Sequence, residues 1–202
     1  MPPKKTDAAP KAAPKAAPKA APKAEAKGKK APALVATPIA AQPEFDLFTY
    51  CELSGETRLE NDLLEELEPR FDDWQRHLKA YRLSTGGEKD PGYVLLWLEK
   101  PVEDEIEGIW QDSPSAGMAF HNLAIHMVMS AVQNIVPELA DRGCAPLPKP
   151  DKAVLAAFKK FGLEWNKEGT VSRQFAVFTN MPALATCGTC MLKAKCESPA
   201  KD

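Results

Sequence analysis

The longest uncharged run in the sequence places the strongest limit on the fold. It begins at Pro114 and is ended by the charged residue Glu138. Its length approaches that of a membrane-spanning helix, but it contains polar side chains that are costly to bury in lipid, namely His121, Asn122, His126, Gln133 and Asn134. The run therefore predicts a buried helix at the centre of the fold, with Asp112 or Ser113 as its N-cap and Pro114 in its first turn.

Three other segments have the apolar spacing of amphipathic helices. In residues 58–83, Leu, Phe, Trp and Tyr recur at steps of three and four throughout, and Pro69 is expected to kink or divide this helix. Residues 101–111 predict a short helix with a strongly acidic outer face. Residues 151–162 predict a further short helix, with Asp151 as its N-cap.

Two segments fit a helix and a strand equally well. The apolar run YVLLWLEK, residues 93–100, is too short for its period to be decisive, and residues 170–186 are also ambiguous. Because helices dominate the remaining segments, the sequence predicts a mostly α fold: a small helical domain with a minor β element at most.

The first 43 residues differ in composition from the rest of the chain. They consist almost wholly of Ala, Pro and Lys, and much of the stretch has a proline at every fourth residue. Such a segment has no large side chains to bury, so we expect residues 1–43 to be a disordered basic tail with polyproline II character. Residues 44–202 have the composition of one globular domain, of which residues 144–199 contain a candidate cysteine site.

Charge is distributed unevenly along the chain. Residues 1–30 carry nine Lys and two acidic residues, a net charge of +7, which leaves −9 on the remainder of a chain whose total is −2. Such a basic segment can be a solubilising arm, can bind an acidic protein surface, or can contact nucleic acid. Its Ala–Ala–Pro–Lys repeat resembles the tails of linker-histone-like proteins. The domain itself has no basic stripe with interleaved aromatic residues, so nucleic-acid contact is expected only through residues 1–30.

The N-terminal sequence MPPKKTDAAPK lacks the apolar core of a secretory signal. We therefore expect a cytoplasmic protein that does not enter a membrane. In a reducing cytoplasm, clustered cysteines indicate metal or redox chemistry rather than structural disulfides.

Three of the five cysteines lie close together near the end of the sequence. Cys187, Cys190 and Cys196 have the spacing C-x2-C-x5-C. Two ligands separated by two residues can bind one metal centre from a single turn, and Gly188 permits the close backbone approach that sulfur ligation needs. Three thiolates are one fewer than a closed zinc site or an iron–sulfur cluster requires, so the pattern predicts a fourth ligand from elsewhere in the chain.

This spacing resembles that of several four-iron–four-sulfur proteins. They include helix–hairpin–helix DNA glycosylases, the SPASM domains of radical enzymes, CRISPR-associated nucleases with one remote and three C-terminal cysteines, and the molybdenum-donating accessory protein of nitrogen fixation. The resemblance covers about ten residues and implies a cluster rather than one family's activity. Asn180 and Pro182 stand where the glycosylase and nitrogen-fixation patterns have a further cysteine, and Ala200 stands where the SPASM pattern has one.

Cys144 is the favoured fourth ligand. It follows Gly143 at a predicted helix end and opens a Pro-rich loop, where the backbone is free to present a ligand. Cys51, in the segment FTYCELSG, is the alternative. His121 and His126 are further alternatives, but they are five residues apart and do not share a helix face. Hydrogen bonding within a core accounts for each of these histidines without a metal.

The cysteine pattern is also compatible with a redox-active dithiol and with a zinc site. A dithiol would be expected within a thioredoxin-like βαβ pattern, which the surrounding sequence lacks. Zinc sites more often use paired C-x2-C units or added histidines, so a four-iron–four-sulfur cluster is favoured and zinc is the alternative.

No motif indicates an active site, and no catalytic residue is assigned. The sequence contains no phosphate-binding loop, dinucleotide fingerprint, serine-nucleophile motif or H-E-x-x-H. We expect an iron–sulfur protein that transfers electrons or serves as an accessory or maturation factor for a larger redox enzyme. The alternative is a non-enzymatic, zinc-stabilised module whose basic tail binds an acidic protein or nucleic acid.

Overall fold

The computed structural model describes residues 33–55, 61–86, 91–142, 145–183 and 190–192. All of them belong to one compact unit, Ala31–Asp202. Within them the chain forms five α-helices and four β-strands, with two short 3-10 helices at Gln75–His77 and Pro137–Arg142. In chain order the main elements are β1 (Val35–Pro38), α1 (Leu47–Ser54), α2 (Asn61–Trp74), β2 (Leu78–Ser84), β3 (Gly92–Leu98), α3 (Lys100–Asp112), α4 (Pro114–Ile135), α5 (Lys152–Lys160) and β4 (Ala176–Met181).

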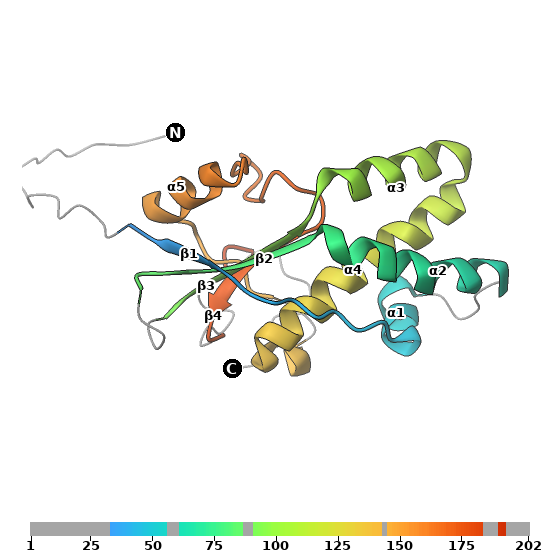
Figure 1. The fold of residues 1–202 in the computed structure, drawn as a ribbon, viewed down its shortest axis with the longest axis horizontal. Helices are drawn as coiled ribbons and strands as arrows, with labels where there is room; N and C mark the ends of the chain where they lie inside the picture. The colour runs from blue at the N-terminus through green and yellow to red at the C-terminus, as the bar shows by residue number, and fades with distance from the viewer. Residues whose placement is uncertain (1–32, 56–60, 87–90, 143–144, 184–189, 193–202) are drawn as a thin grey trace, which may run out of the picture. The chain divides into compact units, whose positions relative to one another are not determined.

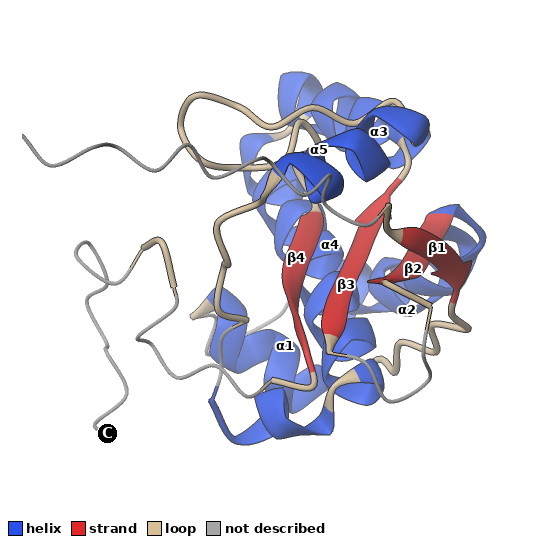
Figure 2. Cartoon of the chain, turned by 90° about the vertical axis from the view of Figure 1, so that its left-hand side faces the viewer, coloured by secondary structure: helices blue, strands red, loops and turns tan. Residues whose placement is uncertain are grey.

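The prediction of a mostly α fold is wrong. The four strands form one antiparallel sheet in the order β1-β2-β3-β4 (Figure 2), so the fold is α+β. The two ambiguous segments, residues 93–100 and 170–186, supply β3 and β4. Strands that are buried on both faces have no polar–apolar alternation, which is why the sequence pattern did not distinguish them from helices.

β3 is a central strand of the sheet and is covered on both faces. It pairs with β2 and with β4, each over six positions. Its side chains alternate between a helix-side core, shared with α1–α4, and an α5-side core, shared with α5. Val94, Leu96 and Leu98 join the helix-side core, and Leu95 and Trp97 join the α5-side core.

The uncharged run forms α4, so the predicted central helix is confirmed. The Ser113 side chain accepts a hydrogen bond from the backbone N–H of Ala116 and caps the helix. α4 contacts α1, α2, α3 and the sheet (Figure 1). At Gly117 a Cβ atom would lie 2.6 Å from the Trp110 ring, so glycine is what allows α3 and α4 to pack closely there. Among the described residues, no helix is both long enough and apolar enough to cross a membrane.

α5 covers the face of the sheet opposite to α4 (Figure 1). Asp151 Oδ1 accepts from the backbone N–H groups of Ala153 and Val154 at 2.9 and 2.8 Å, so the predicted N-cap is confirmed. Val154 and Phe158 then bury their side chains in the α5-side core. The sheet is therefore the middle of three layers.

The helix predicted over residues 58–83 ends earlier than expected. α2 includes Pro69 and ends at Trp74, and after the 3-10 helix Gln75–His77 the chain forms β2. Leu78 and Tyr81 fit the apolar stripe of a helix, but on β2 they pack into opposite cores, Leu78 on the helix side and Tyr81 on the α5 side. Over so short a stretch, apolar residues three apart are compatible with a helix and with a strand. The pairing with β3 makes this stretch a strand.

Residues 33–43 are the described part of the segment that composition predicts to be disordered, and they contribute to the sheet. β1 pairs with β2, and Ile39 N–H continues the pairing to Ala80 O at 3.0 Å. Residues 39–46, which we call the strap, then run along α4 to the start of α1 (Figure 1). Ile39, Ala41 and Phe45 pack against the helix-side core. The average composition of residues 1–43 conceals this apolar pattern.

Candidate functional site

The C-terminal cysteine segment is described at residues 190–192. Met191 N–H donates to Leu147 O at 2.9 Å, so these residues lie beside the loop that leads from α4 to α5. Cys190 is partly exposed, and its thiol is not in a disulfide. Cys144, Cys187 and Cys196 lie outside the described residues, so the convergence of four cysteines stays a prediction.

The loop that accepts this hydrogen bond is itself fixed to β4. Thr179 is fully buried, and its hydroxyl donates to Pro146 O at 2.9 Å. Leu147 packs against the α5-side core. Two hydrogen bonds therefore join β4, the loop that follows Cys144 in the sequence, and the segment that contains Cys190.

Cys51 belongs to a different part of the fold. It lies on α1, is partly buried, and packs against the helix-side core. Its backbone carbonyl accepts from Ser54 Oγ at 3.3 Å. α1 packs on α4, whereas the loop beside Met191 is fixed to β4.

His121 and His126 both lie on α4, in different surroundings. His121 Nδ1 is 3.3 Å from Gln174 Nε2, and partial burial lowers the pKa of this ring. His126 is only 2 % exposed, and its Nε2 accepts from the backbone N–H of Asp46 at 3.2 Å. These contacts give each ring a structural role within the fold.

Three polar side chains of α4 bind the backbone of the strap. They are spaced at four residues and so share one helix face; we call them the polar ladder. Asn134 Nδ2 donates to Gln42 O at 2.6 Å, Ser130 Oγ accepts from Glu44 N at 2.8 Å and donates to Glu44 O at 3.0 Å, and His126 binds Asp46 N. Four residues advance a helix by about 6 Å, and two residues advance an extended chain by about 6.6 Å. The polar ladder can therefore bind every second residue of the strap.

The strap, α1 and α4 enclose a cleft of about 490 Å³. Its lining includes the carboxylates of Glu44, Asp46 and Glu52, and among the described residues that line it there is one titratable basic side chain, His126, and no Lys or Arg. Asp46 Oδ1 accepts from the hydroxyl and the backbone N–H of Thr49 at 2.6 and 2.7 Å. These two hydrogen bonds lower the pKa of Asp46 and make it the N-cap of α1.

The polar ladder could have been identified in the sequence from the four-residue spacing of its side chains. His126, Ser130 and Asn134 are the i, i+4 and i+8 positions of a helix that is otherwise mostly apolar. Their partner could not be found in this way, because the strap is 80 to 92 residues away in sequence and offers backbone groups, which leave no mark on the residue pattern.

Comparison with known proteins adds no relative to these observations. No protein-family model matches the chain, and no curated protein or solved structure matches it. In the part of the chain that the structure describes, no group of three or more His, Cys, Asp or Glu side chains is arranged to hold a metal ion.

Proposed function

We propose that this protein binds one four-iron–four-sulfur cluster through Cys187, Cys190, Cys196 and Cys144. The cluster would transfer electrons, or the protein would deliver or protect a cluster as an accessory of a larger redox enzyme. The observation that carries the proposal is the hydrogen bond from Met191 N–H to Leu147 O at 2.9 Å, which brings together the two chain segments that contain these cysteines.

Chain length limits how far each cysteine can lie from this hydrogen bond. Cys144 precedes Leu147 by three residues, and an extended chain spans at most about 3.6 Å per residue, so its Cα lies within about 11 Å of that of Leu147. Cys190 is adjacent to Met191. Cys187 and Cys196 are four and five residues from Met191, so their Cα atoms can be at most about 14 and 18 Å from the Cα atom of Met191. Chain length therefore permits all four cysteines to lie at one site.

The chemistry of the segment fits a cluster. Thiolates are the soft ligands that iron–sulfur clusters and zinc both accept, and Cys190 has a free, partly exposed thiol. Lys193 and Lys195 lie between Cys190 and Cys196 in the sequence, and positive charge nearby stabilises thiolates and the negative cluster that they hold.

The number of ligands bears on the role. With four thiolates every iron atom is fully ligated, which favours electron transfer or cluster storage over substrate chemistry. The net charge of +7 on residues 1–30 supports an acidic protein surface as the partner, such as that of the redox enzyme that the cluster would serve.

The test is a metal analysis of the full-length protein purified without oxygen. A visible spectrum and assays of iron, acid-labile sulfide and zinc would be compared for the wild type, Cys144→Ala and the matched control Cys51→Ala. The proposal expects a brown wild-type protein with about four iron and four sulfide per chain. Cys144→Ala should lose the colour and most of the iron, and Cys51→Ala should keep both.

Each of three other outcomes would contradict part or all of this proposal. A colourless protein with one zinc per chain would contradict the cluster and would leave a zinc-stabilised interaction module. A protein without metal would contradict both. Bleaching of Cys51→Ala alone would show that α1, rather than the loop before α5, provides the fourth ligand.

A further inference from the structure

His126 joins the strap to the helix-side core. Its ring is 2 % exposed and lies 5.8 Å from the Phe45 ring, 5.8 Å from the Phe71 ring and 6.4 Å from the Tyr50 ring. Its Nε2 accepts from Asp46 N–H, so the hydrogen of the neutral ring is on Nδ1. The strap, α1 and α2 therefore all meet at one titratable side chain.

We propose that His126 is an acid-sensitive latch: uptake of a proton on Nε2 releases the strap from α4 and frees the start of α1. A proton from solvent would bind the Nε2 lone pair, and no other covalent bond would change. Nε2 then becomes a donor facing the N–H donor of Asp46, so the hydrogen bond is lost and a positive charge is left among three aromatic rings.

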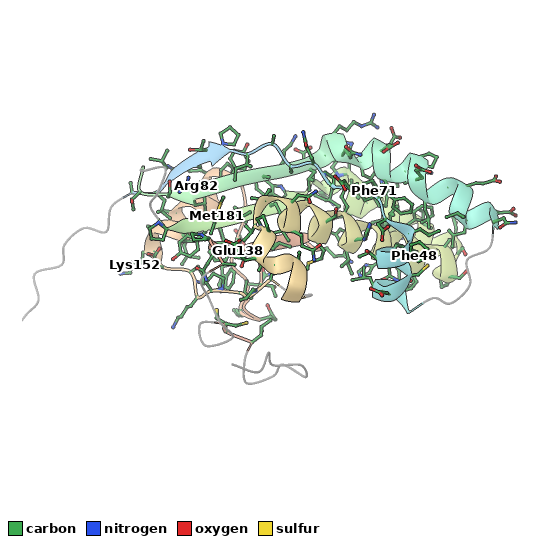
Figure 3. The ribbon with its side chains drawn as sticks, turned by 90° about the horizontal axis from the view of Figure 1, so that it is seen from below. Phe48, Phe71, Arg82, Glu138, Lys152 and Met181 are labelled. Atoms are coloured by element: carbon green, nitrogen blue, oxygen red, sulfur yellow. The ribbon has the colours of Figure 1, made fainter. Side chains whose placement is uncertain are left out.

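The position of Asp46 connects this event to α1. Asp46 donates its backbone N–H to His126 and, through its carboxylate, caps α1 at Thr49. α1 carries Phe48, whose side chain is 82 % exposed; Figure 3 shows Phe48 on α1 and Phe71 on α2 toward the same end of the molecule. Displacement of the strap would therefore move Phe45 away from Phe71 and change the apolar surface presented beside Phe48.

The ionisable groups around the ring come from two elements. The strap contributes Asp46, whose carboxylate attracts a protonated ring, together with Glu44, and α1 contributes Tyr50 and Glu52. α2 contributes the uncharged ring of Phe71. Burial is the largest influence and lowers the pKa of His126, whereas the charge of Asp46 and a hydrogen bond to the Glu44 backbone oppose it.

The sign of the pH dependence follows from these effects. In the open state His126 is hydrated and has an ordinary pKa of about 6.5, whereas in the closed state its pKa is lower. The open state therefore binds more protons below about pH 6.5, and the ratio of open to closed rises by up to about tenfold per pH unit until the lower pKa is passed. Above about pH 7 the ratio does not change.

The test measures hydrogen exchange of the Glu44 and Asp46 amides between pH 8 and 5, as protection factors corrected for the intrinsic rate. Full-length wild type would be compared with His126→Gln, whose amide oxygen can still accept from Asp46 but does not titrate. His121→Gln is the matched control on the same helix. We expect protection to fall below pH 6.5 in the wild type and in His121→Gln, by up to about tenfold per unit, and to stay constant in His126→Gln.

A second measurement keeps the proposal testable if His126→Gln does not fold. The ring protons of His126 and the amide of Asp46 would be followed by NMR in the wild type over the same pH range. A ring that titrates together with the Asp46 amide, with a midpoint below 6.5, supports the latch. Equal acid-induced loss of protection in His126→Gln, or a ring that titrates without any change at Asp46, would overturn it.

Discussion

The strap and the three described residues of the C-terminal cysteine segment are both held against the body of the domain, but by different kinds of contact. The strap makes four hydrogen bonds with the polar ladder, two as donor and two as acceptor, and packs Ile39, Ala41 and Phe45 against the helix-side core. In the three described residues of the cysteine segment, one backbone hydrogen bond is made, and Met191 and Leu192 are 41 % and 44 % exposed.

This difference indicates what holds each segment in place. The strap offsets its loss of conformational entropy with its own packing and hydrogen bonds. Met191 and Leu192 are only partly buried, and the proposed cluster, bound by the cysteines, would give their segment an additional link to the domain. Substitutions in and beside the two regions test this contrast, and their expected effects on the free energy of unfolding range from several kcal/mol to almost none.

The largest effect is expected at Phe71 in the helix-side core. Its side chain is 1 % exposed and packs 5.5 Å from the Phe45 ring of the strap. Phe71→Ala should reduce the free energy of unfolding by about 3–5 kcal/mol, measured by urea denaturation, because it leaves a cavity. The control Phe48→Ala, at an 82 % exposed position, should change it by less than about 0.5 kcal/mol. Similar losses in both variants would contradict the described core.

The polar ladder should contribute less than the core but measurably. Ser130→Ala removes both hydrogen bonds to Glu44 and should cost about 1–2 kcal/mol in the same assay. Gln133→Ala is the control, since Gln133 lines the same cleft without belonging to the polar ladder. If the two variants lose equal stability, the strap is not held by the polar ladder.

Substitution of the N-cap of α5 tests whether the proposed cysteine site depends on this helix. Asp151→Ala removes the acceptor for two backbone N–H groups and should cost about 1 kcal/mol, whereas Asp151→Asn keeps an acceptor and should cost much less. Iron content should be unaffected in both variants, because the Met191–Leu147 hydrogen bond does not involve the cap. Loss of iron in Asp151→Ala would show that the site depends on α5.

The smallest effect on folding is expected at Cys190. In metal-free protein, Cys190→Ser should change the free energy of unfolding by less than about 0.5 kcal/mol, because the side chain is partly exposed. In protein purified without oxygen, the same substitution should remove most of the iron. A large loss of stability without metal would mean that the thiol serves packing rather than a cluster.

Local signals in the sequence predicted the elements that depend on local interactions. The uncharged run and the side chains of Ser113 and Asp151 located α4 and the start of α5, because a helix forms its hydrogen bonds within its own segment. Strand β2 was missed because its hydrogen bonds go to β1 and β3, and only these pairings separate it from a continuation of α2. Long-range pairing therefore accounts for the error in fold class.

The candidate sites were also predictable only where their signals are local in the sequence. The spacing of Cys187, Cys190 and Cys196 is visible in the sequence, and so is the loop position of Cys144. The contact that connects these segments, from Met191 to Leu147, is between backbone atoms and could not be predicted from residue types. The strap likewise offers backbone groups to the polar ladder, and its residues 39–43 belong to the segment that composition assigned to a disordered tail.

Hydrogen exchange in the cluster-loaded and cluster-free protein tests the contrast between the two segments most directly. We predict that removal of the proposed cluster lowers the protection of the Met191 amide by at least about tenfold and leaves that of the Glu44 amide unchanged, since the first would depend on the cluster and the second on the polar ladder. Equal protection of Met191 in both forms would contradict the claim that a cluster holds the cysteine segment in place.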